Sequence, residues 1–139
     1  VDRFSGTVPY QLTVTMFSSP SGSGCTPSST ALCLNGGRFR VESTWQTDQG
    51  QAGLGQAIPL TSDTGYFWFF NSANVEMVVK VLNACGFAGK HWVFAGGLTN
   101  VQVAITVTDT QTGEIRTYVN PQGSAFLPIQ DSSAFATCP

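Results

Sequence analysis

The feature that most constrains the fold of this chain is a two-residue alternation of apolar and polar side chains that recurs along its length. It is present at residues 10–17 (YQLTVTMF), 37–45 (GRFRVESTW) and 74–82 (NVEMVVKVL). Successive side chains of a β-strand point to opposite faces, so this pattern predicts strands with one face in a core. Apolar residues at helical spacing are nearly absent, and Gly or Pro interrupts most windows. We therefore expect an all-β fold, an antiparallel β-sandwich of immunoglobulin-like or jelly-roll-like type.

Further patterns extend the expected strand order. The segment HWVFA at residues 91–95 reads as a short strand, and residues 101–108 and 114–119 as a hairpin joined by the polar, Gly-ended turn DTQTG. The Gly-rich stretch GQAGLGQ, residues 50–56, is expected to be a hairpin loop. It lacks the Lys, Ser or Thr and the following helix that a phosphate site requires.

Five consecutive aromatic residues occur in TGYFWFFN, residues 64–71. In a strand, Tyr66, Trp68 and Phe70 would point to one face, with Phe67 and Phe69 on the other. Both faces are then apolar. We expect one face in the domain's own core and the other beneath a covering element.

The aromatic side chains also suggest an alternative, because exposed Trp and Tyr rings can stack on sugars. Tyr66 and Trp68, together with Trp45 or Trp92, are the candidates for a carbohydrate-binding or interface surface. Core or interface packing is preferred over sugar binding, because the phenylalanines of the run offer no hydrogen-bonding group.

The four cysteines, Cys25, Cys33, Cys85 and Cys138, are expected to form disulfides. None is spaced as in a zinc site and the single histidine does not complete one, so no metal site is expected. Three connectivities are possible, and sequence alone does not choose between them. We favour Cys25–Cys33, which closes the loop CTPSSTALC, and Cys85–Cys138, which ties the chain end to the middle of the domain. Disulfides imply an oxidising compartment.

The chain carries few charges: 10% of its residues are charged, where about 25% is usual, and its formal net charge is -2. It has no basic footprint for nucleic acid and no apolar run long enough to cross a bilayer, so neither nucleic-acid binding nor membrane insertion is expected. Because the chain starts at VDRFSG without a basic leader, we expect a mature secreted chain or an excised extracellular domain. A neutral surface also suits subunits that pack against copies of themselves.

No catalytic arrangement stands out in the sequence. A hydrolytic triad needs an imidazole base, and the only histidine, His91, lies beside a turn in GKHWVF, where a half-buried strand residue is expected. The acidic residues are scattered singly, so no pair of glycosidase type is evident. We expect no enzyme, no catalytic residue and no cofactor.

The segment SSPSGSG at residues 18–24 sets the first alternating segment apart from the rest of the chain. We expect residues 1–24 to be an N-terminal strand with a flexible linker, and residues 25–139 to be the sandwich domain. The strand can complete its own domain or fill a gap in a neighbour's sheet, and the sequence leaves both open. The side chains expected to form this assembly strand are Phe4, Tyr10, Leu12, Val14 and Met16.

Several long motifs carry a resemblance over residues 25–139. They are CTPSSTALCLNGGRFRVESTW, AIPLTSDTGYFWFFNSANVEMVVKVLNACG, WVFAGGLTNVQVAITVTDTQTGEIRTY and FLPIQDSSAFATCP, in this order. Together they resemble a recurring secreted bacterial domain, found in predicted extracellular proteins alone, in tandem or near the C-terminus. The resemblance implies a secreted, disulfide-containing β domain, and it implies no activity.

The sequence thus favours an extracellular structural protein that associates with copies of itself into a surface filament or matrix by donating its N-terminal strand. A donated strand makes a contact that does not close on itself, so it propagates as a fibre. The alternative is a monomeric adhesive module that binds a carbohydrate or a surface.

Overall fold

The computed structural model describes residues 24–138. The expected assembly strand, with Phe4, Tyr10, Leu12, Val14 and Met16, lies outside the described residues. Within them the fold is all-β, as predicted, and contains no helix. The strands are β1 (Leu32–Leu34), β2 (Phe39–Gln46), β3 (Ala52–Leu54), β4 (Gln56–Pro59), β5 (Thr64–Trp68), β6 (Met77–Asn83), β7 (His91–Gly97), β8 (Gln102–Asp109), β9 (Ile115–Asn120) and β10 (Ile129–Phe135).

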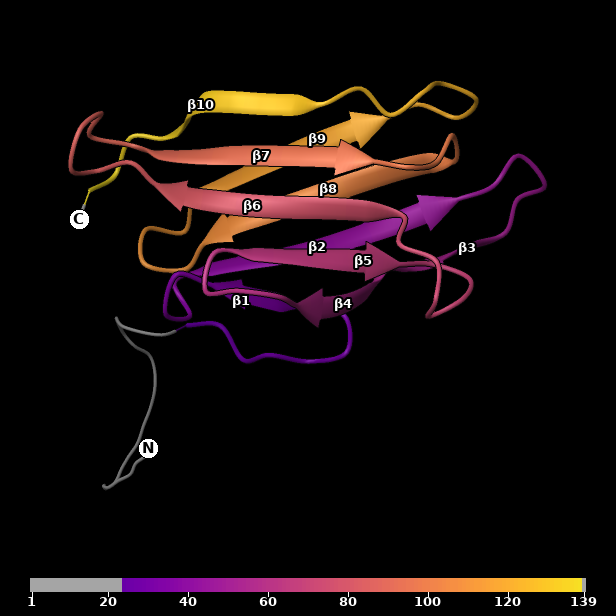
Figure 1. The fold of residues 1–139 in the computed structure, drawn as a ribbon, viewed down its shortest axis with the longest axis horizontal. Coiled ribbons are helices and arrows are strands. Elements are labelled where there is room, and N and C mark those ends of the chain that lie inside the picture. The colour runs from indigo at the N-terminus through magenta and orange to yellow at the C-terminus, as the bar shows by residue number, and fades with distance from the viewer. Residues whose placement is uncertain (1–23, 139) are drawn as a thin grey trace.

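The strands form two antiparallel sheets that pack face to face (Figure 1). Sheet A has the order β1-β2-β8-β9, with β3 also paired to β2, and sheet B has the order β10-β7-β6-β5-β4. β1 pairs with the first half of β2 and β3 with its second half, on the edge away from β8. Because β1 and β3 share one edge of β2, sheet A is only four strands across although it contains five strands, whereas sheet B is five strands across.

The core lies between the two sheets and follows the predicted alternation. In β2, Phe39 and Val41 are fully buried, and in β6 the same is true of Met77, Val79 and Val81. The strands expected at residues 37–45, 74–82, 91–95, 101–108 and 114–119 are confirmed as β2, β6, β7, β8 and β9, with ends that shift by a few residues.

Both expected disulfides, Cys25–Cys33 and Cys85–Cys138, are confirmed. The prediction for residues 50–56 was wrong in part, because Ala52–Leu54 forms β3 and pairs with β2. Gly55 then takes the chain directly from sheet A to sheet B, where a side chain would collide with the Ser43 hydroxyl and crowd Phe67. The Gly-rich composition of this stretch therefore reflects close packing at a crossing between sheets as well as a turn.

The aromatic run also deviates from its expected pattern at its end. Phe67 and Phe69 are buried in the core, as expected. The strand ends at Trp68, however, and Phe70 does not continue the face of Tyr66 and Trp68. Its ring packs edge-on against Trp45 of sheet A, with the ring centroids 4.6 Å apart.

Candidate functional site

One side of the sandwich, which we call the closed side, is formed by β1 and β3 of sheet A and β4 of sheet B. β1 and β4 lie at the lower edge in Figure 1. Backbone hydrogen bonds cross between the sheets here. The N–H of Ala57 in β4 donates to the carbonyl of Ser29 at 2.8 Å, and the N–H of Asn35 donates to the carbonyl of Ser62 at 2.7 Å. The Cys25–Cys33 disulfide closes the loop that carries Ser29. The edge of β4 is thus occupied by the chain itself.

Packing at the closed side is as tight as its hydrogen bonding. Gly65 of β5 faces Leu32 of β1, and a Cβ atom at Gly65 would lie 2.5 Å from Leu32 Cδ1. The glycine is required because β1 lies too close to β5 for any side chain. This side therefore leaves no room for a further strand.

The opposite side, which we call the open side, is formed by the end strands β9 and β10 (Figure 1, upper edge). Among the described residues no strand pairs with the outer edge of either. The two strands meet through side chains: Tyr118 Oη donates to Asp131 Oδ2 at 2.7 Å, and the Arg116 guanidinium lies 5.1 Å from the ring centroid of Phe135. Burial, together with the hydrogen bond to Asp131, raises the pKa of Tyr118 above its usual range. The hydroxyl therefore remains a donor at any ordinary pH.

The two edges of the open side differ in regularity. β10 is interrupted between Asp131 and Phe135, where its register against β7 shifts. β9 pairs with β8 through six consecutive residues without a break. Its outward side chains include no charge, and Ile115 and Val119 are 54% and 59% exposed. Proteins often protect such an edge with a proline, a bulge or an inward-pointing charge. β9 has no proline and no bulge, and its one charged residue, Arg116, points toward Phe135 and donates to the carbonyl of Ile115 at 3.0 Å.

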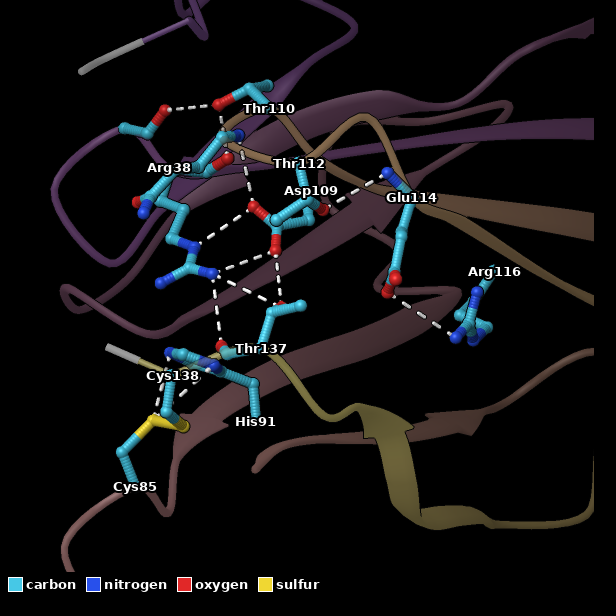
Figure 2. A network of polar contacts seen from close by, with 12 residues as sticks. Arg38, Cys85, His91, Asp109, Thr110, Thr112, Glu114, Arg116, Thr137 and Cys138 are labelled. Atoms are coloured by element: carbon cyan, nitrogen blue, oxygen red, sulfur yellow. Dashed lines mark hydrogen bonds and ion pairs between the residues drawn. A yellow bond between two sulfur atoms is a disulfide. The ribbon is translucent and has the colours of Figure 1, made fainter. Parts of the chain in front are cut away.

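A polar cluster fixes the end of the molecule from which β9 starts (Figure 2). Arg38 holds Asp109 through two hydrogen bonds, both 2.9 Å long, and donates to the carbonyl of Thr137 at 3.1 Å. The Thr137 hydroxyl donates to Asp109 Oδ2 at 2.9 Å. Burial alone would raise the pKa of Asp109, but the hydrogen bonds from Arg38 and Thr137 outweigh it, so the net shift is downward. The cluster ties the residues after β10 to β8 and to the start of β2.

His91 lies next to this cluster and beside the Cys85–Cys138 disulfide (Figure 2). It is 2% exposed, more deeply buried than expected. Burial and the nearby Arg38 guanidinium lower its pKa, so the ring is neutral at pH 7. The two sulfurs and a ring nitrogen lie within 4.8 Å of one another, but sulfurs joined in a disulfide are not thiolate ligands for a metal.

The described chain begins at the same end of the sandwich. Gly24 packs against Thr110 in the turn between β8 and β9, where a Cβ atom at Gly24 would lie 2.7 Å from Thr110 Cβ. The N–H of Thr110 donates in turn to the carbonyl of Arg38 at 2.9 Å. The N-terminal segment therefore joins the domain close to where β9 starts.

The outer face of sheet B carries most of the predicted aromatic surface. Tyr66 and Trp68 lie on it in β5, and Trp92 lies on it in β7 near the opposite end of the strands. All three are half-buried. We call this surface the aromatic face; its outward side chains are Ile58, Tyr66, Trp68, Val78, Lys80, Leu82, Trp92 and Phe94.

Trp45 is not part of the aromatic face. It belongs to β2 of sheet A, where it packs against the core with its indole across Gly53 and in ring contact with Phe69 and Phe70. The predicted grouping of Trp45 with Tyr66 and Trp68 is therefore wrong. Trp45 lies on the inward-facing row of its strand.

A shallow hollow of about 250 Å³ lies on the aromatic face, above Gly96 of β7. Glycine leaves space at this position, since no atom lies within 4 Å of where its Cβ would be. Thr64, Lys80 and Gln130 line the hollow together with Phe94 and several apolar residues. No local sequence pattern predicts the hollow, because its residues come from strands that lie far apart along the chain.

No helix that could span a membrane occurs in the part of the chain that the structure describes. Comparison of the chain with protein families, with curated proteins and with solved structures finds no match.

Proposed function

We propose that this protein is an extracellular structural subunit that associates with copies of itself, each copy donating its N-terminal strand, residues 10–17, to a neighbour. The observation that carries the proposal is the unequal width of the two sheets, four strands against five, with the missing place on the open side. One added strand beside β9 would give both sheets five strands. The alternating sequence YQLTVTMF has one apolar and one polar face, as such a strand requires.

Two further properties support the proposal. The chain has few charges, so little charge must be desolvated when copies pack together. Its four cysteines form two disulfides, a feature typical of proteins outside the cytosol. The resemblance to secreted bacterial domains points to the same compartment.

The test compares three full-length chains, purified without reductant, by light scattering and negative-stain microscopy. Val14→Asp places a charge on the apolar face of the donated segment, and Thr13→Asp places the same charge on its polar face. We expect polymers for the wild type and for Thr13→Asp, and monomers for Val14→Asp. A wild-type chain that stays monomeric at all concentrations would overturn the proposal.

A second candidate function is binding of a polysaccharide on the aromatic face. The hollow above Gly96 favours it, because Thr64, Lys80 and Gln130, which have polar side chains, line the hollow together with the aromatic Phe94. Titration of the protein with polysaccharides, followed by tryptophan fluorescence, tests this candidate. Phe94→Ala should weaken binding while Leu54→Ala, on an exposed site of sheet A, should not.

A further inference from the structure

We propose that the acceptor of the donated strand is the outer edge of β9, which pairs antiparallel with residues 10–17 of a second copy. This inference rests on the proposed function and names the surface that receives the strand. The open side offers two edges, β9 and β10, and their backbone geometry separates them. β10 is bulged and two serines protrude from it, whereas β9 is regular along its whole length. A regular edge is the better template for a new ladder.

The hydrogen bonds of β9 show which of its groups are available. The N–H of Asp109 donates to the carbonyl of Glu114 at 2.8 Å, so these two residues form a hydrogen-bonded pair at the start of the ladder. Along an antiparallel ladder, hydrogen-bonded pairs alternate with pairs that share no backbone hydrogen bond. The backbone groups of Ile115, Thr117 and Val119 consequently face away from β8, toward the free edge. The carbonyl of Ile115 accepts from Arg116 Nη1 at 3.0 Å. A strand laid along this edge would bond to Thr117 and Val119 and would displace the arginine from Ile115.

Register decides what the new strand buries. If Val14 lies opposite Arg116 or Tyr118, then Leu12 and Met16 share the inner face with it, because opposed residues of two strands point to the same side. These apolar side chains would then face β10, the end strand of sheet B. Among the described residues, sheet A has no strand beyond β9 to cover β10. A shift by one residue would expose Leu12, Val14 and Met16, so burial selects a register in which these three side chains face inward.

Both registers suit the outer face of sheet A. Thr117 of β9, which is itself opposite Thr106 of β8, would lie opposite Thr13 if Val14 pairs with Arg116, and opposite Thr15 if Val14 pairs with Tyr118. Threonine side chains in neighbouring strands pack and hydrogen-bond well. The donated strand thus continues the polar surface on one side and the core on the other.

The length and attachment of the N-terminal segment agree with this acceptor. Residues 18–24 can span at most about 25 Å, while β9 is about 20 Å long. Gly24 lies beside Thr110, at the end from which β9 starts. A donated strand would leave its own domain near one open edge; its own β9 lies within the same reach, and the experiments below distinguish the two acceptors. The contact with a neighbouring copy is heterologous and repeats from copy to copy.

Proline at position 117 tests the acceptor in the full-length chain. The N–H of Thr117 faces outward, so Thr117→Pro spares the pairing of β9 with β8 but removes a donor from the free edge. Ser132→Pro is the matched control, since Ser132 lies in the bulge of the other open edge. We expect monomers for Thr117→Pro and wild-type polymers for Ser132→Pro by light scattering.

A mixing experiment gives the decisive readout. Val14→Asp keeps its acceptor but cannot donate, and Thr117→Pro can donate but cannot accept. An equal mixture should form a species of two chains, twice the 14.7 kDa of one chain, and nothing larger. Each variant alone should stay monomeric.

The outcomes separate this inference from the proposed function. Wild-type polymers that Val14→Asp abolishes and Thr117→Pro leaves intact would show that strand donation occurs at another edge, and would overturn only the inference. A monomeric wild type whose stability falls non-additively with both substitutions would place the strand on its own β9. That result would overturn the proposal of a neighbouring copy.

Discussion

At the closed side of the sandwich, β1 and β4 are joined by backbone hydrogen bonds through Ser29 and Asn35, whereas at the open side β9 and β10 touch through the side chains of Tyr118 and Arg116. Both sides exclude water from the same core. The closed side does so with backbone hydrogen bonds between its elements, whereas no strand among the described residues pairs with the outer edge of β9, where Arg116 covers only the carbonyl of Ile115. The difference teaches that the two sides of one sandwich can cover the same core by different means, one with backbone and the other with side-chain contacts.

The largest expected loss of stability comes from removing the disulfides, of which one lies at the closed side and the other beyond the end of β10. Cys85–Cys138 closes a loop of 53 residues and Cys25–Cys33 a loop of 8. Replacing the pair Cys85 and Cys138 by Ala should cost about 4 kcal/mol of unfolding free energy, against about 2.5 kcal/mol for Cys25 and Cys33, because the longer loop gains more freedom on unfolding. Denaturant unfolding of both double variants measures the difference. A larger loss at the closed side would reverse the ranking.

Acid should weaken the interactions of Asp109, near the open side, more than those of groups at the closed side. The folded-state pKa of Asp109 is lowered, so its stabilisation is present above the unfolded pKa, about 4, and is lost as pH falls through the folded value. Asp109→Asn should cost about 3 kcal/mol at pH 7, since it leaves Arg38 without its charged partner, and should flatten the loss of stability in acid.

Asp63 of the closed side is the control for this effect. A hydrogen bond from Thr64 is the main cause that lowers its pKa, and the group lies in a more exposed turn. Asp63→Asn should change stability less and leave most of the acid dependence in place. Equal acid dependence of Asp109→Asn and the wild type would contradict the role given to the buried pair.

The smallest expected effect on the free energy of unfolding is that of a single proline, placed at each of the two edges in turn. In Ala57→Pro the closed side loses the hydrogen bond to Ser29, at a cost of about 2 kcal/mol, while Thr117→Pro should cost less than about 1 kcal/mol. Both variants are best measured in a Val14→Asp background, so that no donated strand contributes. If the two prolines destabilise equally, the outward N–H of Thr117 has a partner other than the donated strand, and the edge of β9 is not open.

The fold follows from the sequence to a large extent because it depends on local alternation. The buried rows of β2 and β6 could be predicted residue by residue, and so could the turn between β8 and β9. The open side could not be predicted, because local alternation does not say which strands lie at the end of each sheet. The Arg38–Asp109 pair spans 71 positions, and no local pattern connects two such residues. Trp45 was misplaced because alternation gives a face within a strand and not the sheet to which the strand belongs.

The Cys85–Cys138 bond also bears on how the domain would carry mechanical load. Tension applied at Cys138 passes through the sulfur atoms to Cys85, at the end of β6, and so bypasses β10. At the other end, tension applied at Cys25 passes to Cys33 in β1. The strand at the edge of sheet B, which a pull would otherwise peel away first, is thereby shielded. Force would instead act on β6, which lies inside sheet B, and on β1, the end strand of sheet A beside the backbone hydrogen bonds of the closed side.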